Sequence, residues 1–380
     1  MTMRFAHVSL ALGSLAGVDG AIRGIAAAAR RAELPLDVII LAPEGREEGE
    51  VRIVPYRRWR RFEHKQRLFR YRAIASAPLE DYDVVFLRYP SSLDLDPDAL
   101  FRRRPGRRIA TIHHTKEIAE LASGRRTPGI AARMLLEWVG GRRVLSRVDG
   151  IVGVTDEIRR YEVARAGRAK PSAAISNGID VEQVPFTRFT PFAGSTLRLV
   201  VVASSIAPWH GWDRLQAALR SYRGSVRIVV DAVGQFGAPA GTTEHGTSFE
   251  VRYHGLLRND ALSKVLESAN VAMSSLALHR AGLREGCVLK TREYAARGLP
   301  FVYAYDDVDL QPHDPFCLRL PSGNAAVAID EILQFVSQVP KDVSEHSRAV
   351  ALARMDWTTK ARAFTEFGRM LAGENAFPSP

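Results

Sequence analysis

Two glutamates, Glu285 and Glu293, flank the predicted start of a helix in the stretch 284–300. If the eight-residue spacing is helical, it rises by about 12 Å at about 1.5 Å per residue, roughly the span from the hexose to the ribose of a nucleotide sugar. A helix N-terminus between them is a natural seat for a diphosphate, because its backbone N–H groups lack partners and its dipole favours negative charge. One carboxylate could bind sugar hydroxyls and the other a ribose diol. The alternative is that Glu293 pairs with Lys290 or Arg297 on a solvated helix face.

A second candidate site is the adjacent pair His113 and His114, which follows the predicted strand 108–112. Ligands of parallel sheets bind beyond the carboxyl ends of the strands, so we expect one of the two histidines to face a ligand. Adjacent side chains at a strand end point in opposite directions, and we favour His113. No third or fourth ligand is spaced to complete a zinc site, so we predict no metal and no cofactor. The acidic run 306–309 is interpreted as a polar loop.

The elements that must position these residues alternate along the chain. Short apolar runs are followed by longer helical patterns, which is typical of parallel strands joined by crossover helices. The predicted strands are 4–12, 36–42, 51–56, 83–87, 108–112, 150–154, 172–175, 197–203, 226–231, 249–254, 271–274 and 301–305. The predicted helices of the second half are 209–222, 260–269, 287–297 and 358–371. The pattern indicates a doubly wound α/β fold.

The domain boundary is predicted in the segment 177–195, which opens on Asn-Gly, contains Pro185 and Pro191 and shows no periodicity. We therefore predict an N-terminal Rossmann-like domain over 1–180 and a C-terminal one over 196–355. The closing segment 356–380 is too short to form a domain, so we expect its helix to pack back on the N-terminal domain.

Composition narrows the class of protein. The chain has 380 residues, two cysteines and a formal net charge of +11. Two cysteines cannot build a disulfide framework, which indicates a reducing compartment such as a cytoplasm. No apolar run approaches the roughly 18 residues that a membrane span requires. Residues 51–150 hold 22 Lys and Arg against 11 Asp and Glu, so they carry the whole charge excess.

Much of that excess lies in the segment 57–72, where basic and aromatic residues are interleaved, and in a second basic run at 101–108. Such a composition suits an anionic membrane surface, where each cation contributes about 1 kcal/mol. The residues that we expect to face the membrane are Arg57, Arg58, Trp59, Arg60, Arg61, Lys65 and Arg67. A solvated helix face with aromatic residues in the core is the close alternative. Nucleic acid ranks third, and we predict no nucleic-acid partner.

The stretch 284–300 resembles the signature of the retaining family-four glycosyltransferases of the GT-B fold. That signature is two glutamates separated by seven residues, then a short helix that ends in a Gly-x-Pro turn before a buried strand. Here the turn is Gly298-Leu299-Pro300 and the strand begins at Phe301. This version of the signature is similar to the branch found among bacterial surface-polysaccharide glycosyltransferases. The resemblance implies two Rossmann-like parallel-sheet domains that face each other across a cleft.

The resemblance also implies roles for individual residues. It places Glu285 near the donor sugar, Glu293 on the nucleotide ribose, and the backbone N–H groups of Gly286, Cys287 and Val288 on the phosphate. A histidine after the strand, here His113 or His114, would contact the donor sugar and support the transition state.

Two further stretches occur in the order that the family demands. The Asn-Gly-Ile-Asp run at 177–180 matches the end of the family's first domain. The glycine-rich stretch 12–21 resembles the loop after the first strand, where Gly17, Asp19 and Gly20 would approach an acceptor or a phosphate.

The opening of the second domain departs from the family pattern. Where the family has an arginine and a lysine on the donor pyrophosphate, this chain has Ser205 and His210, which supply far less positive charge. Lys290, Arg284 and Arg280 are the nearest candidates to restore the charge, and we favour Lys290. The alternative for His210 is a residue at a helix start that is hydrogen-bonded to the backbone.

These observations predict a glycosyltransferase that moves a sugar from a nucleotide diphosphate sugar to a hydroxyl of a glycan or lipid-linked glycan. Retention of configuration, independence of metal and a role in surface-polysaccharide synthesis, such as capsule, exopolysaccharide or O-antigen, are implied by the resemblance. We expect a cytoplasmic protein, peripheral at the inner face of the membrane. Two alternatives remain: a nucleotide-sugar epimerase of GT-B fold, and a non-catalytic sugar-nucleotide binding protein, which Ser205 and His210 make plausible.

Overall fold

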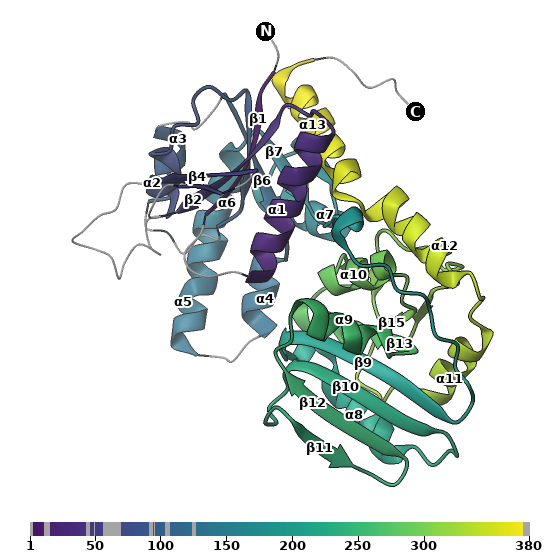
Figure 1. Ribbon diagram of the computed structural model, residues 1–380. Coiled ribbons are helices and arrows are strands. Elements are labelled where there is room, and N and C mark those ends of the chain that lie inside the picture. Colours follow the sequence, from purple (N-terminus) through teal and green to yellow (C-terminus); the bar gives the residue numbers. More distant parts are fainter. Residues whose placement is uncertain are drawn as a thin grey trace. The chain divides into compact units, whose positions relative to one another are not determined.

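The chain forms two units, each built on a mostly parallel β-sheet (Figure 1). The computed structural model describes residues 3–10, 16–42, 46–48, 50–55, 70–90, 94, 96–102, 107–123 and 127–374. Unit 1 comprises residues 1–180 and 357–380, and unit 2 comprises residues 181–356. The predicted architecture of two Rossmann-like α/β domains is confirmed.

The sheet of unit 1 has the strand order β3-β4-β2-β1-β5-β6-β7-β8. Its strands are β1 (Phe5–Leu10), β2 (Leu36–Ala42), β3 (Arg46–Glu48), β4 (Val51–Pro55), β5 (Val84–Arg88), β6 (Arg108–His113), β7 (Gly150–Gly153) and β8 (Ser172–Ala174). All pairs are parallel except β3 with β4. The central strands carry apolar residues on both faces, because helices cover both sides of a parallel sheet.

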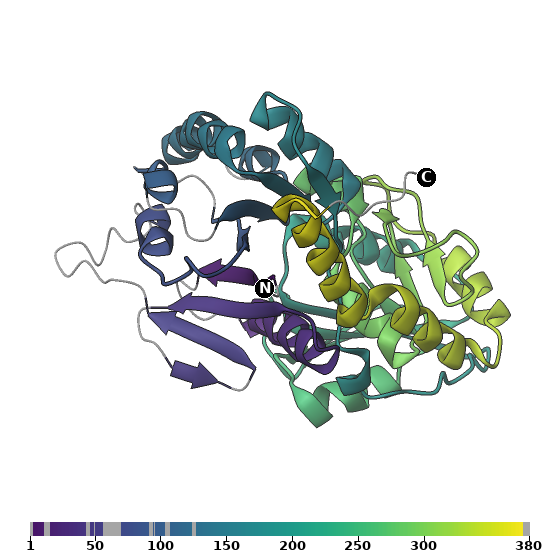
Figure 2. The ribbon, with the colours of Figure 1, turned by 90° about the horizontal axis from the view of Figure 1, so that it is seen from above.

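Helices lie on both faces of this sheet (Figures 1 and 2). They are α1 (Ala16–Arg31), α2 (Arg70–Ala75), α3 (Ala99–Arg102), α4 (Glu117–Ser123), α5 (Pro128–Leu136), the π-helix η2 (Glu137–Gly141), α6 (Arg142–Arg147), α7 (Asp156–Ala166) and α13 (Trp357–Ala372). The first turn of α7 is capped by Thr155, whose hydroxyl accepts a hydrogen bond from the Ile158 N–H at 3.2 Å. The helix ends at Gly167, whose φ of 73° is left-handed and favours glycine.

The C-terminal helix α13 packs on the same sheet face as α1, although more than 300 residues separate them in sequence. The two helices approach closely at Gly24, where a Cβ atom would lie 2.5 Å from the Trp357 ring. Phe364 of α13 also packs edge-on against Phe86 of β5, with ring centroids 5.2 Å apart. The apolar stripe of α13 thus completes the core on this face of unit 1.

The sheet of unit 2 has the order β11-β12-β10-β9-β13-β15-β17, and only β11 runs antiparallel to its neighbour. Its strands are β9 (Thr196–Ser205), β10 (Arg227–Gln235), β11 (Thr242–His245), β12 (Phe249–Gly255), β13 (Val271–Met273), β15 (Phe301–Tyr303) and β17 (Cys317–Arg319). A separate two-stranded sheet joins β14 (Glu285–Gly286) to β16 (Asp306–Asp307). The helices are η3 (Val181–Gln183), η4 (Pro208–His210), α8 (Trp212–Ser221), α9 (Asn259–Glu267), η5 (Leu278–Ala281), α10 (Leu289–Arg297), α11 (Ile329–Gln338), α12 (Val343–Val350) and η6 (Ala351–Met355).

The edge strands were not predictable from apolar runs. β3 reads Arg-Glu-Glu and β11 reads Thr-Thr-Glu-His, so neither carries the apolar pattern that marks a strand. Both instead extend a hairpin from an apolar neighbour, β4 or β12. The predicted helix 209–222 is also shorter, because Gly211 adopts a left-handed φ of 70° and separates η4 from α8. Within the described ranges, none of the helices has the length and apolar character needed to cross a bilayer.

Candidate functional site

The segment that carries the two candidate glutamates is a strand followed by a helix. Glu285 and Gly286 form β14, which pairs in parallel with β16, and α10 begins only at Leu289. The prediction of a helix from residue 287 is therefore wrong at its start, and the rise of a continuous helix does not describe the spacing. At Gly286 a Cβ atom would lie 2.7 Å from the Leu278 side chain and 2.9 Å from the Tyr305 ring, so a larger residue there would force these side chains to shift.

The N-terminus of α10 lies between the two glutamates in the chain. Its N-cap is Val288, with φ −70° and ψ 129°, which supplies no side-chain hydrogen bond to the first turn. A helix start without a side-chain cap leaves backbone N–H groups that an anion can accept from. Cys287, just before it, is buried. The local backbone therefore has the features that phosphate binding requires, although the predicted contacts of Gly286, Cys287 and Val288 with a phosphate remain predictions.

Lys290 stands in the first turn of α10, and its ammonium group is unusual in its surroundings. The Nζ atom is buried, and it has no hydrogen-bond partner within the part of the chain that the structure describes. It lies 5.9 Å from the centroid of the Trp209 ring, a distance at which a cation–π attraction acts. Burial lowers the pKa of Lys290 to about 7. A buried ammonium without an opposite charge is costly, and a bound diphosphate would supply that charge.

Glu293, one turn later, makes the ion pair that was the alternative to ligand binding. Its Oε1 accepts a hydrogen bond from Nε of Arg297 at 3.0 Å. The pair is not on a freely solvated face, because the Arg297 side chain is only 6% exposed and also donates to the Ser263 hydroxyl. The Glu293 side chain is still 30% exposed, so its role on a ribose remains a prediction beside the observed ion pair.

Arg292, on the same helix, has a structural role. Its guanidinium is fully buried and forms ion pairs with Asp307 and Asp309. Those carboxylates raise the pKa of Arg292 against the lowering effect of burial. The acidic run 306–309, predicted as a polar loop, therefore includes a buried anchor that fastens β16 to α10.

The residues at the usual pyrophosphate positions do not supply positive charge. Ser205 is exposed at the end of β9. His210 is buried in η4, where its Nδ1 accepts a hydrogen bond from the Ala207 N–H at 2.9 Å. Burial, together with the charge of Lys290, lowers the pKa of His210 to about 3. The imidazole is neutral, and the alternative of a helix-start residue bonded to the backbone describes it.

The two arginines considered as replacements differ from Lys290. Arg280 is held by Asp213, with nitrogen–oxygen distances of 2.7 and 2.9 Å, and by the Asn324 side chain at 2.8 Å. The guanidinium thus fastens η5 to the start of α8, and its role on the donor stays a prediction beside these contacts. Arg284 has an 86% exposed side chain that lies 4.0 Å from Asp306. Lys290 is thus the favoured cation that combines burial with the absence of an acidic partner among the described residues.

The preference for His113 over His114 stays a prediction, and the surroundings of the two rings differ. His113 is fully buried, and its Nε2 lies 3.0 Å from the Thr111 hydroxyl. Its ring is tilted against Tyr89 at 4.5 Å, and its Nδ1 lies 3.8 Å from Glu162. Burial lowers the pKa of His113 well below its usual value, with a contribution from nearby Arg165. His113 therefore belongs to a buried polar cluster in unit 1, although its Nδ1 has no hydrogen-bond partner among the described residues.

His114 is the better candidate of the pair. Its Nε2 is buried and has no hydrogen-bond partner in the described ranges. Burial lowers the pKa of His114 well below its usual value, and the neighbouring Arg88 and His7 act in the same direction. A neutral imidazole with an unused ring nitrogen, at the carboxyl end of β6, can donate to or accept from a bound hydroxyl.

The remaining predicted residues belong to the glycine-rich stretch and to the basic segment, and the structure describes only some of them. Gly17, Asp19 and Gly20 belong to the first turns of α1, which begins at Ala16, so the glycine-rich stretch is helical there and not a loop. Residues 11–15 lie outside the described residues. The residues expected to face a membrane, Arg57, Arg58, Trp59, Arg60, Arg61, Lys65 and Arg67, also lie outside them. In the described part of the chain, no cluster of three or more His, Cys, Asp or Glu could hold a metal ion.

Sequence reasoning missed the aromatic neighbour of the candidate lysine. The ring of Trp209 faces the ammonium of Lys290, about 80 residues away in the chain. No spacing in the sequence links the two, since a turn after β9 and a helix after β14 bring them together. Sequence reasoning also missed the buried cluster around His113, because Glu137 and Glu162 lie on later helices and no spacing links them to His113.

Comparison with known proteins gives this geometry its context. Residues 16–183 match the family described as Glycosyltransferase Family 4. Sucrose-phosphate synthase from Thermosynechococcus elongatus is 14% identical, with a TM-score of 0.66 over 98% of this chain and 100% of that one. HepE from Anabaena, in complex with UDP, is 13% identical, with a TM-score of 0.60 over 96% and 99%. A glycosyltransferase from Rickettsia africae is 10% identical, with a TM-score of 0.66 over 98% and 100%. None of the curated proteins matches the chain.

These likenesses establish the GT-B fold over nearly the whole chain. The class of enzyme that they support is that of the GT-B glycosyltransferases, which use a nucleotide-sugar donor.

Proposed function

We propose that this chain is a retaining, metal-independent glycosyltransferase that uses a nucleoside diphosphate sugar and transfers the sugar to a hydroxyl of a glycan or lipid-linked glycan. Its place would be in the synthesis of a surface polysaccharide. The observation that carries the proposal is the buried ammonium of Lys290, without an acidic partner in the described part of the chain, in the first turn of a helix without a side-chain cap. That pairing of cation and N–H groups fits a diphosphate, and Glu285 precedes it by five positions.

In the proposed mechanism the bond between sugar and diphosphate breaks first, and negative charge gathers on the diphosphate. The N–H groups of α10 and the Lys290 ammonium stabilise that charge without rearranging, because they are fixed before the reaction begins. Glu285 holds hydroxyls of the donor sugar, Glu293 holds the ribose, and His114 contacts the sugar. The acceptor hydroxyl attacks from the face that the diphosphate leaves and passes its proton to a phosphate oxygen. The proposed sequence requires no protein nucleophile.

The donor nucleotide is tested first with UDP. HepE, whose fold this chain shares, has been crystallised with UDP and with UDP-glucose. Thermal shift with UDP, GDP, ADP and dTDP would identify the base, since a ligand that binds the folded state raises stability by RT ln(1 + [L]/Kd). The Lys290→Met variant should lose most of the shift. Lys264→Met, an exposed lysine of α9, is the matched control and should keep it.

Transfer itself is tested with the identified donor and candidate glycan acceptors, and the anomeric configuration of the product is read by NMR. We expect Glu285→Gln to lower turnover by about 100-fold or more, as loss of a group that acts on the transition state does. Glu267→Gln, an exposed glutamate at the end of α9, is the control that should keep full turnover. Full turnover in the Glu285 variant would contradict the site.

Lys290 can be assigned to the developing charge by a split between kinetic parameters. A group that acts mainly on the transition state lowers kcat more than it weakens donor binding. Equal losses in both quantities for Lys290→Ala would contradict that role.

A non-catalytic sugar-nucleotide binding protein is the second candidate, because His210 is neutral and Arg280 is committed to Asp213. It predicts a thermal shift with a nucleotide sugar but no product with any acceptor. A nucleotide-sugar epimerase would instead convert the free donor without an acceptor, which the same NMR assay detects.

The proposal includes a lipid-linked acceptor at the inner face of the membrane, in the cytoplasm, and excludes nucleic acid as a partner. Its support is the concentration of positive charge in residues 51–150. An anionic membrane surface would hold both the acceptor and a basic face of the protein.

A further inference from the structure

One helical segment of unit 1 has a buried side, held by charged residues, and an opposite side that is exposed. Helix α5, the π-helix η2 and helix α6 follow one another without interruption from Pro128 to Arg147. Glu137 of η2 is only 2% exposed and accepts hydrogen bonds from the Tyr89 hydroxyl at 2.9 Å and from Arg165 at 2.7 Å. At Gly141 a Cβ atom would lie 2.2 Å from the Arg165 guanidinium, so this side has no room to turn.

The opposite side of this segment carries an apolar triplet formed by Leu135, Trp138 and Val139. Their exposed fractions are 61%, 59% and 54%, and they are among the most exposed large apolar residues in the described part of the chain. Spacings of three and four residues place them together on one side of a helix. Helix α5 has no buried residue at all. Single exposed apolar residues are ordinary, but a group that includes tryptophan marks a surface that another body covers.

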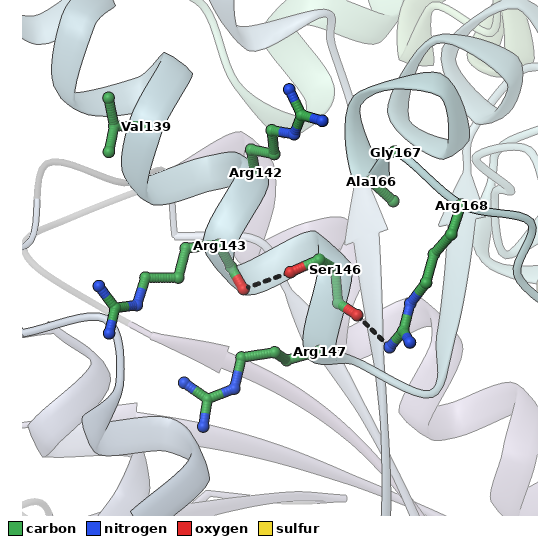
Figure 3. Close-up of a pocket in the computed structure, with 8 residues that line it drawn as sticks. All are labelled: Val139, Arg142, Arg143, Ser146, Arg147, Ala166, Gly167 and Arg168. Atoms are coloured by element: carbon green, nitrogen blue, oxygen red, sulfur yellow. Dashed lines mark hydrogen bonds between the residues drawn. The ribbon is translucent and has the colours of Figure 1, made fainter.

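Directly beyond the triplet lies an arginine pocket of about 570 Å³, lined by Arg142, Arg143, Arg147 and Arg168, with Val139 at its edge (Figure 3). Figure 3 shows three of these arginines leaving the same short stretch of helix, while Arg168 reaches in from the turn after α7. Val139 belongs both to the apolar triplet and to the pocket lining, so the two features form one continuous surface.

The positive charge of the pocket is only partly compensated. Arg143 and Arg147 share one carboxylate, that of Asp98, at 2.8 and 2.6 Å. Arg168 donates to the backbone carbonyl of Ser146, which carries no formal charge. Arg142 is exposed, and its guanidinium makes no hydrogen bond or ion pair within the described ranges.

A nearby lysine shows that the positive charges of this region act on one another. The pKa of Lys170 is lowered by burial and further by Arg168. Like charges held this close favour an anion as ligand.

We propose that the apolar triplet and the arginine pocket together dock the protein on an anionic phospholipid bilayer. A lipid phosphate enters the pocket between Arg142 and Arg168. Leu135, Trp138 and Val139 enter the boundary between headgroups and acyl chains. A protein surface that lies in a membrane interface needs cations at the lipid phosphates and apolar residues, tryptophan among them, beside these cations.

Other occupants fit the surface less well. Nucleic acid would use the arginines and could stack one base on Trp138, but Leu135 and Val139 would stay exposed to water. A second copy of the chain would cover the triplet yet place two arginine pockets of the same charge at a shared interface, which costs free energy. The inference does not rest on the proposed transfer reaction, and it concerns residues outside the basic segment 57–72.

The test is co-sedimentation of the full chain with phosphatidylcholine vesicles, with and without phosphatidylglycerol, at low salt. The wild type should bind only the anionic vesicles and release them as salt is raised. Arg142→Ser combined with Arg168→Ser should lower the partition coefficient about 30-fold, from about 1 kcal/mol for each cation. Arg223→Ser combined with Arg258→Ser, two exposed arginines of unit 2, is the matched control and should bind as the wild type does.

The apolar part has its own variants. Trp138→Ser combined with Val139→Ser should lower partitioning by about tenfold or more, because the apolar area that enters the interface is lost. Leu256→Ser, at a position that is 57% exposed in unit 2, is the control and should have no effect. Brominated lipid should quench part of the tryptophan fluorescence, and Trp138→Phe should remove that part.

Three results would overturn the inference. The first is wild-type sedimentation of the arginine variant. The second is a dimer in light scattering that Trp138→Ser converts to a monomer. The third is loss of binding through serine substitutions in 57–72 while the arginine variant still binds. Since Arg142, Arg168 and Trp138 are exposed, the variants should fold, and their thermal shift with UDP should stay unchanged. A failure of membrane docking is thereby distinguished from a failure of the proposed donor site.

Discussion

The polar cluster beneath η2 in unit 1 and the start of α10 in unit 2 both bury charged side chains, but they resolve the cost differently. In the cluster, Arg165 lies 2.7 Å from Glu137 and 2.7 Å from Glu162. At the start of α10, Arg292 has two acidic partners, whereas the ammonium of Lys290 has no acidic or hydrogen-bond partner among the described residues.

The comparison distinguishes buried charges that stabilise the fold from buried charges that serve a ligand. A buried charge that faces an opposite charge holds elements together, because its removal leaves the partner unpaired. A buried charge without such a partner lowers stability, and a protein that keeps it has a use for it that the unliganded chain does not show. Arg292 and Lys290 stand two positions apart on one helix and offer a direct contrast between the two cases.

The largest expected effect comes from the paired arginine. Arg292→Met leaves Asp307 and Asp309 with no cation, and we expect the free energy of unfolding to fall by about 3–5 kcal/mol. Urea denaturation followed by circular dichroism measures it. A loss below about 1 kcal/mol would show that the ion pairs of Arg292 do not stabilise the fold, and the contrast with Lys290 would disappear.

The unpaired lysine should respond with the opposite sign. Lys290→Met replaces a costly ammonium by an apolar chain of similar length, and we expect a gain of about 1–4 kcal/mol at pH 7. The same denaturation experiment measures it, with Lys264→Met as the exposed control. A loss of stability would show that Lys290 has a partner in the folded protein and would undermine its role at a ligand site.

The pH dependence sharpens this second prediction. Because burial lowers the pKa of Lys290 to about 7, the unfolded chain holds its proton up to higher pH than the folded chain does. Stability of the wild type relative to Lys290→Met should therefore rise with pH above 7, by about 2 kcal/mol between about pH 7.5 and 9. Below the folded pKa the difference should level off. A flat difference across this range would contradict the lowered pKa.

The adjacent histidines give the smallest expected effect. His113→Phe removes the contact with Thr111 inside the cluster, and we expect a loss of about 1–2 kcal/mol in stability. His114→Phe should change stability by less than about 0.5 kcal/mol, because its buried nitrogen has no hydrogen bond to lose in the described structure, but should lower turnover. If the His113 variant loses turnover at unchanged stability, the assignment of the two residues is reversed.

The fold was predicted well from the sequence, because the spacing of apolar residues along a segment indicates which of its faces are buried. Apolar runs such as 36–42 are buried on both faces of a parallel sheet, and the structure places β2 over the same residues. The start of α10 was predicted two residues early, because the pairing of Glu285 and Gly286 with β16 is a long-range contact that a local pattern does not carry. The edge strands β3 and β11 were missed for the same reason.

The candidate site was predicted as a set of residue types, and the structure decided which of them are free to act. Arg280 and Arg284 were candidates beside the favoured Lys290, yet Arg280 is held by Asp213 and Arg284 is largely exposed. His113 and His114 differ only by the alternation of a strand end, which turns His113 toward Glu162 and leaves His114 less enclosed.

By itself, the sequence determined two parallel-sheet domains, the position of the candidate donor helix and the concentration of positive charge in the first domain. Those properties follow from local periodicity and composition, which each segment carries alone. Only the tertiary structure decided that Lys290 is buried beside Trp209, that Arg292 is paired, and that Trp138 faces outward while Glu137 faces inward. Burial and pairing depend on residues far apart in the chain, so no single segment can specify them.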